Sequence, residues 1–160
     1  MTFEIPFEII HLGSEDNIHI VVNAQLAEMP VRLVVDTGAS HSCLCKKITK
    51  PIYKKAHIVK ADAVMGIGKC RLNNQMMQVP RFELGELTLE DYPFLMLSLS
   101  HINKMLKMMD LQPIHGLLGG DLLFKYNAII DYGERKISFK RRNCLRITRM
   151  NKTLDTMHYS

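Results

Sequence analysis

Short apolar runs separated by turn-forming residues are the main pattern of this chain. Runs rich in Val, Ile, Leu and Phe and bounded by Gly, Pro, Asn or Asp are typical of β-strands. We expect strands at residues 3–12, 17–23, 30–35, 92–99, 117–118, 127–131 and 136–140, with residues 24–28 as a connection. Residues 41–48 fit a strand or a short helical turn, and the pattern leaves both open.

Two further segments predict hairpins because glycine interrupts an otherwise extended pattern. One is residues 82–89, which alternate about Gly85. The other has residues 58–65 and 69–79 as its arms and Gly66-Ile67-Gly68 at its tip, although Asn73-Asn74 could instead break the second arm. Glycine gives the backbone conformational freedom, so this tip is expected to be mobile.

One segment has helical periodicity. Ser100 occupies an N-cap position ahead of residues 101–111, and Pro113 follows as a stop signal. Apolar residues at helical spacing on this segment are expected in the core: Ile102, Met105, Leu106 and Met109. A second, shorter helix is expected to start at Asp121. Many strands, two short helices and no βαβ alternation predict a mostly β fold of barrel or paired-sheet type.

Length and charge describe one ordinary globular domain. The chain has 160 residues, 47% of them hydrophobic, and a formal net charge of +5. Basic residues gather in residues 46–60 and 136–149, yet no basic motif interleaved with aromatic residues is present. We therefore expect no nucleic-acid partner. The domain is expected to span residues 1–140, and residues 141–160 form a basic tail, either a dimer-interface strand or a loose end.

The cysteine pattern and the first residues bear on compartment. Cys43 and Cys45 form a C-x-C pair that differs from the spacing of structural zinc sites, and no histidine cluster completes a ligand set. Together with Cys70 and Cys144 they are expected to be reduced thiols, with no metal bound. No basic and apolar leader opens the sequence, and no run reaches membrane-spanning length. We expect a cytoplasmic protein.

Candidate chemistry begins at the end of one expected strand. Residues 33–40 read Leu-Val-Val-Asp-Thr-Gly-Ala-Ser and run from a buried strand into a turn, with Asp36 at the junction. A carboxylate at the buried end of a strand is costly unless it is hydrogen-bonded. Asp36 is therefore a functional-site hypothesis, and the alternative is a structural acid that caps a turn.

Together with two later segments, this stretch resembles a known family. The Asp-Thr-Gly-Ala turn, the glycine-tipped hairpin and Leu-Leu-Gly-Gly-Asp-Leu-Leu at residues 117–123 occur in the order found in retropepsin-like aspartic proteases. The similarity extends over about residues 3–140. It implies a closed β-barrel or paired-sheet acid protease fold. It also implies an aspartic endopeptidase that cleaves extended polypeptides without a cofactor.

The resemblance also implies roles for the matching residues. Asp36 would be the catalytic aspartate, and Gly38 would bring its N–H to the carboxylate. Thr37 would hold a hydroxyl network that locks two such loops together across a dimer axis. The resemblance also implies that substrate is bound by Ala39, Leu118 and the flap residues Gly66, Ile67 and Gly68.

Further residues support or tune the expected loop. Leu117, Leu118 and Gly119 would pass beneath it, and Asp121 would be structural at the start of the following helix. Alanine at position 39 cannot donate a side-chain hydrogen bond to the carboxylate, whereas Ser or Thr could. We therefore expect a working pH less acidic than that of stomach-type enzymes.

The family mechanism needs two carboxylates that share one proton and hold a water. This chain has one matching motif, because in Asp131-Tyr132-Gly133 a tyrosine replaces the hydroxyl residue and a hairpin turn explains the sequence better. The second aspartate must then come from a second copy, which predicts a C₂ homodimer with Asp36 on its axis. The alternative is a catalytically silent dimerisation or peptide-binding module with the same fold.

Overall fold

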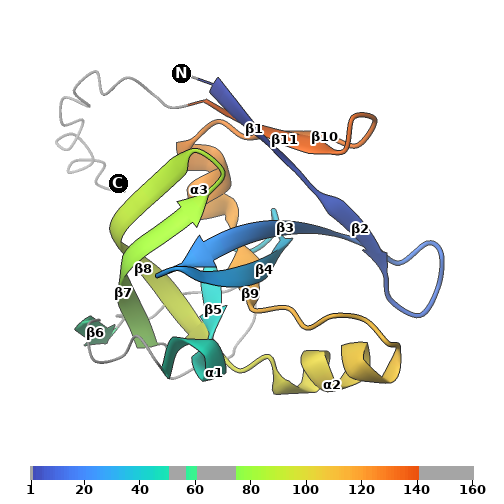
Figure 1. Cartoon of the computed structure of the whole chain (residues 1–160), viewed down its shortest axis with the longest axis horizontal. Helices are drawn as coiled ribbons and strands as arrows, with labels where there is room; N and C mark the ends of the chain where they lie inside the picture. The colour runs from blue at the N-terminus through green and yellow to red at the C-terminus, as the bar shows by residue number, and fades with distance from the viewer. Residues whose placement is uncertain (1, 51–56, 61–74, 141–160) are drawn as a thin grey trace, which may run out of the picture.

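Six strands close into a barrel in the computed structural model, which describes residues 2–50, 57–60 and 75–140. Each strand pairs with the next in the order β3-β4-β9-β5-β8-β7, and β7 pairs back onto β3 (Figure 1). The bounds are β3 (Ile18–Leu26), β4 (Met29–Val35), β9 (Gly116–Leu118), β5 (Cys43–Cys45), β8 (Leu87–Leu97) and β7 (Gln75–Leu84). Two more strands extend this sheet: β2 (Glu8–His11) beside β3 and β6 (His57–Lys60) beside β7.

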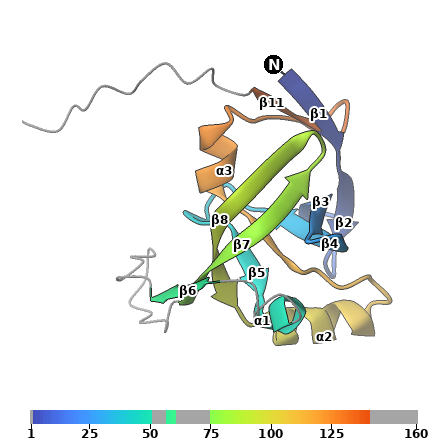
Figure 2. The same cartoon turned by 60° about the vertical axis from the view of Figure 1, so that its left-hand side comes forward.

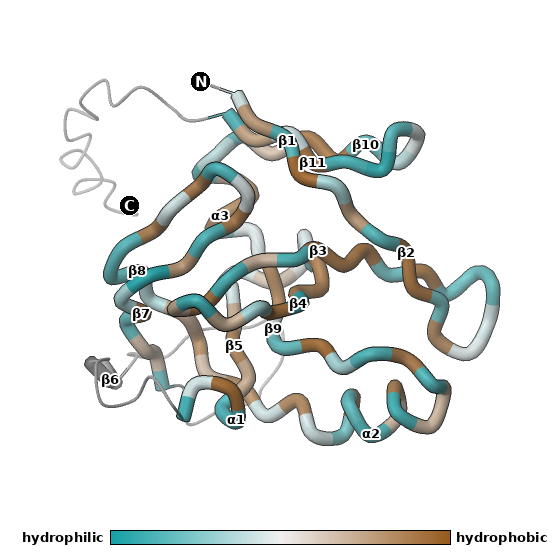
Figure 3. The backbone as a smooth tube through the Cα atoms, in the orientation of Figure 1, coloured by the Kyte–Doolittle hydropathy of each residue, from teal (hydrophilic) through white to brown (hydrophobic). Residues whose placement is uncertain are grey.

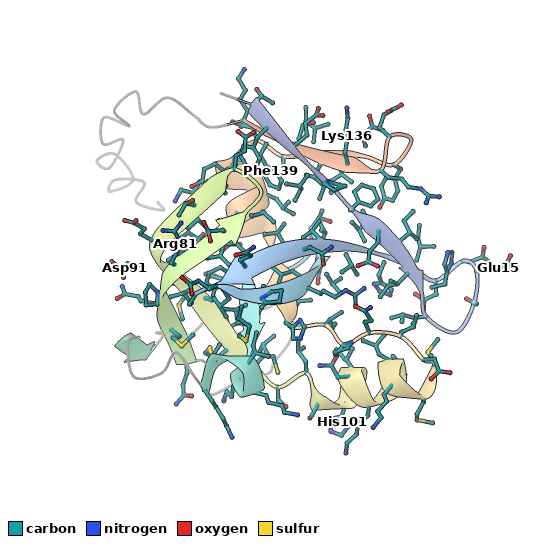
Figure 4. All side chains as sticks on the ribbon, viewed as in Figure 1. Glu15, Arg81, Asp91, His101, Lys136 and Phe139 are labelled. Carbon is teal, nitrogen blue, oxygen red and sulfur yellow. The ribbon has the colours of Figure 1, made fainter. Side chains whose placement is uncertain are left out.

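A separate three-stranded antiparallel sheet covers one end of the barrel (Figure 1). Its order is β1 (Thr2–Pro6), β11 (Lys136–Lys140) and β10 (Ile129–Asp131). Phe3 and Phe139 stack with ring centroids 5.2 Å apart. Figure 4 shows Phe139 between this sheet and the tip of the β7–β8 hairpin. Both layers contribute to one hydrophobic core, which confirms the expected mostly β fold.

Three helices are present in the described residues: α1 (Lys46–Thr49), α2 (Ser100–Met108) and α3 (Gly120–Lys125). Figures 1 and 2 both place α1 and α2 at the end of the molecule away from the three-stranded sheet. None of the helices in the described ranges is long and apolar enough to cross a membrane. Asp121 lies in the first turn of α3, as the sequence predicted.

Several expected strand boundaries are corrected. Residues 3–12 form two strands in different sheets. The strand is interrupted at Phe7, whose N–H donates to the Arg135 carbonyl at 3.0 Å. The connection expected at residues 24–28 shrinks to a two-residue turn, Ala27 and Glu28, both at positive φ (47° and 71°). The sequence left either a strand or a short helical turn open for residues 41–48. The segment contains both, because β5 leads directly into α1.

Both expected hairpins have paired arms. Leu84 pairs with Leu87 across the turn at Gly85, which has a φ of +57°. β6 and β7 pair antiparallel, with Lys60 opposite Gln75. The tip of that second hairpin, including Gly66, Ile67 and Gly68, lies outside the described residues, as does the predicted tail at residues 141–160.

Helix α2 differs from its prediction in two ways. Leu99 is the N-cap, and Ser100 is the first helical residue. The Ser100 hydroxyl bonds to Ser98 Oγ at 3.1 Å and caps no backbone N–H. The apolar stripe is also only partly buried: Leu106 is inaccessible, whereas Ile102 and Met105 are 38% and 44% exposed. The tube in Figure 3 accordingly alternates between hydrophobic and hydrophilic colours along α2.

Candidate active site

The Asp36 loop begins where β4 ends against β9. These strands are parallel, with Val34 opposite Leu117 and Val35 opposite Leu118. The Asp36 N–H continues the pairing by donating to the Leu118 carbonyl at 3.0 Å. Asp36 is half-buried at this point. Its position is therefore fixed by a paired strand on the floor of the loop.

The turn after Asp36 folds back onto the carboxylate. The Gly38 N–H donates to Asp36 Oδ1 at 2.9 Å, and the Ala39 N–H donates to the Asp36 carbonyl at 3.2 Å. A Cβ at position 38 would lie 3.3 Å from the same Oδ1, so a side chain there would crowd the carboxylate. The structure thus brings together the Asp36, Gly38 and Ala39 backbone predicted from the sequence. Thr37 and Gly38 are exposed at the tip.

The glycine pair at the start of α3 lies directly against this turn. The Gly120 N–H donates to the Ala39 carbonyl at 2.7 Å, and the Gly119 N–H donates to Ser42 Oγ at 2.9 Å. A Cβ on Gly119 would lie 2.7 Å from the carbonyl carbon of His41. Two backbone segments therefore touch here, and only glycine leaves room for both.

Asp121 ties together three parts of the chain beneath the loop. Its Oδ1 accepts hydrogen bonds from the Ser42 N–H at 2.8 Å and the Ser42 hydroxyl at 2.7 Å, and Oδ2 accepts from the Tyr92 hydroxyl at 3.1 Å. Burial, together with the Asp121 charge, raises the pKa of Tyr92 well above its usual value. The Tyr92 hydroxyl therefore stays protonated and remains a donor. Sequence reasoning found Asp121 but missed Tyr92 and Ser42, which lie 29 and 79 residues away from it along the chain.

Removing the Asp121 carboxylate should destabilise the fold. In Asp121→Ala, the fully buried Ser42 loses the acceptor for both its N–H and its hydroxyl. Each unsatisfied buried donor costs about 1–3 kcal/mol, so we expect the free energy of unfolding to fall by roughly 2–4 kcal/mol. Chemical denaturation at fixed protein concentration measures this change. Asp121→Asn keeps an acceptor oxygen for Ser42 and should recover most of the loss; equal destabilisation by both variants would contradict the hydrogen-bond explanation.

A cavity of ≈ 470 Å³ opens beside the Asp36 carboxylate. That volume lies within the range of about 300–1,000 Å³ that is usual for ligand sites. Its lining combines Asp36 and His19 with nine apolar residues drawn from β2, β4, β9, α2 and the segments that flank them: Ile10, Leu12, Val34, Val35, Ile102, Met105, Leu106, Ile114 and Leu117. The carboxylate is therefore one polar group at the edge of an apolar pocket.

The prediction that Leu118 contacts substrate is corrected by this cavity. Leu118 is fully buried in the barrel core, whereas its neighbour Leu117 is half-buried and lines the cavity. The reason is the alternation of side chains along β9, which sends successive residues to opposite faces. Leu118 acts on the site through its backbone carbonyl, which accepts the hydrogen bond from the Asp36 N–H.

Cys43, one of the two cysteines among the described residues, is a buried thiol. Burial raises the pKa of Cys43 to about 12, and the charges of Asp121 and Asp36 act in the same direction. Its Sγ donates to the His41 carbonyl at 3.2 Å. Thiolate is the reactive form, so Cys43 is excluded as a nucleophile. Within the described ranges, no group of three or more His, Cys, Asp or Glu residues is arranged to hold a metal ion.

The segment that leads into β9 is clamped to β4 by Arg32. The Arg32 guanidinium donates to the carbonyls of Gln112 (3.0 Å) and Pro113 (3.2 Å) and forms an ion pair with Glu8 at 2.7 Å. The Arg32 N–H also donates to His115 Nδ1 at 2.9 Å, and the His115 N–H donates to the Arg32 carbonyl at 2.7 Å. His115 Nδ1 must therefore be unprotonated. This clamp could not be predicted from the sequence, because Arg32 is 80 or more residues from Gln112, Pro113 and His115.

Acidification should weaken this clamp. Burial, followed by the nearby Arg32 charge, lowers the pKa of His115 below its ordinary value. The folded state therefore favours neutral His115. The resulting stabilisation is fully present above the unfolded-state pKa of about 6.5, and it is lost as the pH falls through the lower pKa of the folded state. Asn at position 115 offers an acceptor oxygen but does not titrate. Between pH 7 and pH 5, we expect the free energy of unfolding of His115→Asn to fall by less than that of the parent chain, with a difference on the order of 1 kcal/mol.

Denaturant titrations at a series of pH values measure the difference. His101→Asn is the matched control, because Figure 4 shows His101 on the outer side of α2. It removes one imidazole without touching Arg32. Identical pH slopes for His115→Asn and the parent chain would rule out His115 as the titrating group.

The closed barrel, with the Asp-Thr-Gly turn held by β9 and the glycine pair beneath it, has the retropepsin-like aspartic protease fold. A family model described as aspartyl protease matches residues 22–122. The chain belongs to the aspartyl protease family. The matched region includes Asp36 and Asp121 and ends just inside α3.

Two solved structures are similar to this chain. A retropepsin-like aspartic protease from Rickettsia conorii is similar with a TM-score of 0.50 and 18% sequence identity, over 87% of this chain and 90% of that one. The retroviral protease-like domain of Ddi1 from Leishmania major has a TM-score of 0.48 and 15% identity, over 79% of this chain and 98% of that one. No curated protein is similar enough in sequence to match.

Proposed function

We propose that the chain is an aspartic endopeptidase that acts as a homodimer on extended polypeptides. The observation that carries this proposal is the Asp36 carboxylate, held by the Gly38 N–H at 2.9 Å and open to an apolar cavity of ≈ 470 Å³. Such a cavity suits peptide side chains, and Asp36 is one of the residues that line it. Membership of the aspartyl protease family supports the same chemistry.

A single protomer offers one such carboxylate, so the mechanism requires a second copy. Two Asp36 carboxylates brought together on a twofold axis cannot both ionise, and they share one proton. The ionised carboxylate accepts a proton from a water that attacks the scissile carbonyl carbon. The protonated one donates its proton to the carbonyl oxygen. The carboxyl group that took the water proton then gives it to the amide nitrogen as the C–N bond breaks. The other carboxylate takes a proton from a hydroxyl group of the tetrahedral intermediate, so the acid and amine products leave and the shared proton is restored.

The surface around the loop tip supports this assembly. Thr37, exposed at the tip, lies beside a second cavity of ≈ 300 Å³ that is also lined by Leu123 and Phe124 of α3. Phe124 is 75% exposed, and Ile129 on the neighbouring β10 is 67% exposed. Large apolar side chains exposed next to the loop are typical of a surface that a partner covers. In the proposed dimer, Thr37 of each copy would link the two loops.

A mixed peptide library, with and without the aspartic protease inhibitor pepstatin, tests the activity, and sedimentation tests the assembly. We expect cleavage that pepstatin abolishes and a particle of twice the chain mass. A monomer that still cleaves would overturn the shared-proton mechanism. Peptide binding without cleavage, in folded and dimeric protein, would replace the enzyme by a binding module.

A further inference from the structure

The outer wall of the cavity beside Asp36 is built by α2. Ile102 and Met105 lie three residues apart on one face of this helix and line the same cavity as Asp36. They remain 38% and 44% exposed, although Leu106 on the same helix is fully buried. Large apolar side chains left exposed in a cavity gain stability when an apolar group covers them.

Hydrogen bonds hold this wall in a fixed place. The Asn103 side chain donates to the Ile114 carbonyl and accepts from the Ile114 N–H, both at 2.9 Å. Ile114 is itself buried and lines the cavity. Since the chain continues from Ile114 into β9, one short segment joins α2 to the floor of the Asp36 loop. A pocket wall anchored in this way can discriminate between side chains by size.

We propose that Ile102 and Met105 of α2 set the substrate preference by closing a pocket for one large apolar side chain near the scissile bond. The inference rests on the proposed endopeptidase function. An apolar side chain fits because nine of the eleven residues that line the cavity are apolar, so a polar group placed against this wall would be desolvated without a hydrogen-bond partner. A large one is required because the cavity measures ≈ 470 Å³.

Twofold symmetry adds a second consequence. The proposed dimer contains two copies of the pocket, one beside each Asp36. Changing the wall therefore alters preference at two substrate positions placed symmetrically about the scissile bond. A change in general stability would not single out such a pair of positions.

The test uses the full chain with a substitution that fills the pocket and one that opens it. Met105→Trp should lower kcat/KM about tenfold or more for a peptide with Phe at the preferred positions, while a matched Ala peptide changes by less than about twofold. Met105→Ala should shift preference toward still larger side chains. Met108→Trp is the matched control, because Met108 is on the same helix, is 87% exposed and does not line the cavity.

A binding measurement separates this inference from the proposed function. The Phe and Ala peptides are titrated into Asp36→Asn, with and without Met105→Trp, so that affinity is read without turnover. If the parent chain cleaves peptides but the Met105 variants keep its preference, the α2 pocket is wrong and the endopeptidase stands. If nothing is cleaved but Met105→Trp selectively weakens binding of the Phe peptide, the pocket stands and the endopeptidase is wrong. If the Met105 variants keep the parent chain's preference in both cleavage and binding, the proposed pocket is wrong.

Discussion

Asp36→Asn should abolish the proposed peptide cleavage while leaving the fold and the proposed dimer intact. Asparagine keeps the shape of the side chain and an acceptor oxygen for the Gly38 N–H, which lies 2.9 Å from Oδ1 in the parent chain. It can neither take a proton from water nor share one with a second carboxylate. General acid–base catalysis contributes about 10²–10⁴-fold, and both catalytic groups of the dimer are lost together, so we expect kcat to fall by at least about 10³-fold. Single-turnover peptide cleavage measures the rate, and sedimentation checks the dimer.

Mixed dimers make this test quantitative. If both Asp36 carboxylates are required, co-refolding equal amounts of parent and Asp36→Asn chains leaves about one quarter of the dimers active, from random pairing in a C₂ assembly. If each protomer works alone, about half of the activity remains. Asp91→Asn is the matched control, because Asp91 is exposed and its φ of 49° is tolerated by asparagine. Half-activity in the mixture would contradict a shared active site.

The sequence predicted the local geometry of the Asp36 loop because the contacts that shape it are local. Asp36, Gly38 and Ala39 contact one another within a few residues, and the apolar run before them marks the buried strand. The glycine pair before Asp121 marks the close approach of a second backbone, which the structure shows at Gly119. Both signals depend on residue type at short range, so one sequence suffices to find them.

The rest could not be predicted because it depends on long-range pairing. Nothing near Phe7 shows that the first apolar run divides between two sheets, since the partner that ends it is Arg135. Helical spacing correctly placed Ile102 and Met105 on one face of α2, but it could not show that this face borders a cavity. Leu117 and Leu118 are both leucines, and only the orientation of β9 decides which one reaches the cavity.

One short stretch of chain connects the proposed catalytic carboxylate to the proposed specificity pocket. Between Gln112 and Gly120 the chain is clamped by Arg32, bonded to α2 through Asn103 and then passed beneath the Asp36 loop. The position of the acid and the position of the pocket wall therefore share one support. A substitution that displaces this stretch should change both the cleavage rate and the substrate preference. An informative position is Gly119, where the stretch packs closely against another part of the backbone.

Gly119→Ala should damage both stability and catalysis. The added Cβ would lie 2.7 Å and 2.8 Å from the carbonyl carbon and oxygen of His41 and 2.9 Å from the Ser42 nitrogen. All three are backbone atoms, so no side-chain rotation can relieve the contact, and the segment carrying Ser42 must move. Overpacking of this kind costs about 1–3 kcal/mol of unfolding free energy. Displacing a catalytic group by about 1 Å can cost 10²-fold in rate, and we expect a loss of that order in kcat.

Gly133→Ala separates this effect from a general effect of alanine. Gly133 is exposed, and its added Cβ would meet one side-chain atom, Asp131 Oδ1 at 3.3 Å, which accepts a hydrogen bond from the Glu134 N–H. It would meet no backbone atom of the kind that surrounds Gly119. We expect a change within about 0.5 kcal/mol and unchanged cleavage. Denaturation and peptide kinetics on both variants decide between the alternatives. Parent-like stability and rate in Gly119→Ala would mean that the two backbones do not need to touch, and the support assigned to Gly119 beneath the Asp36 loop would have to be abandoned.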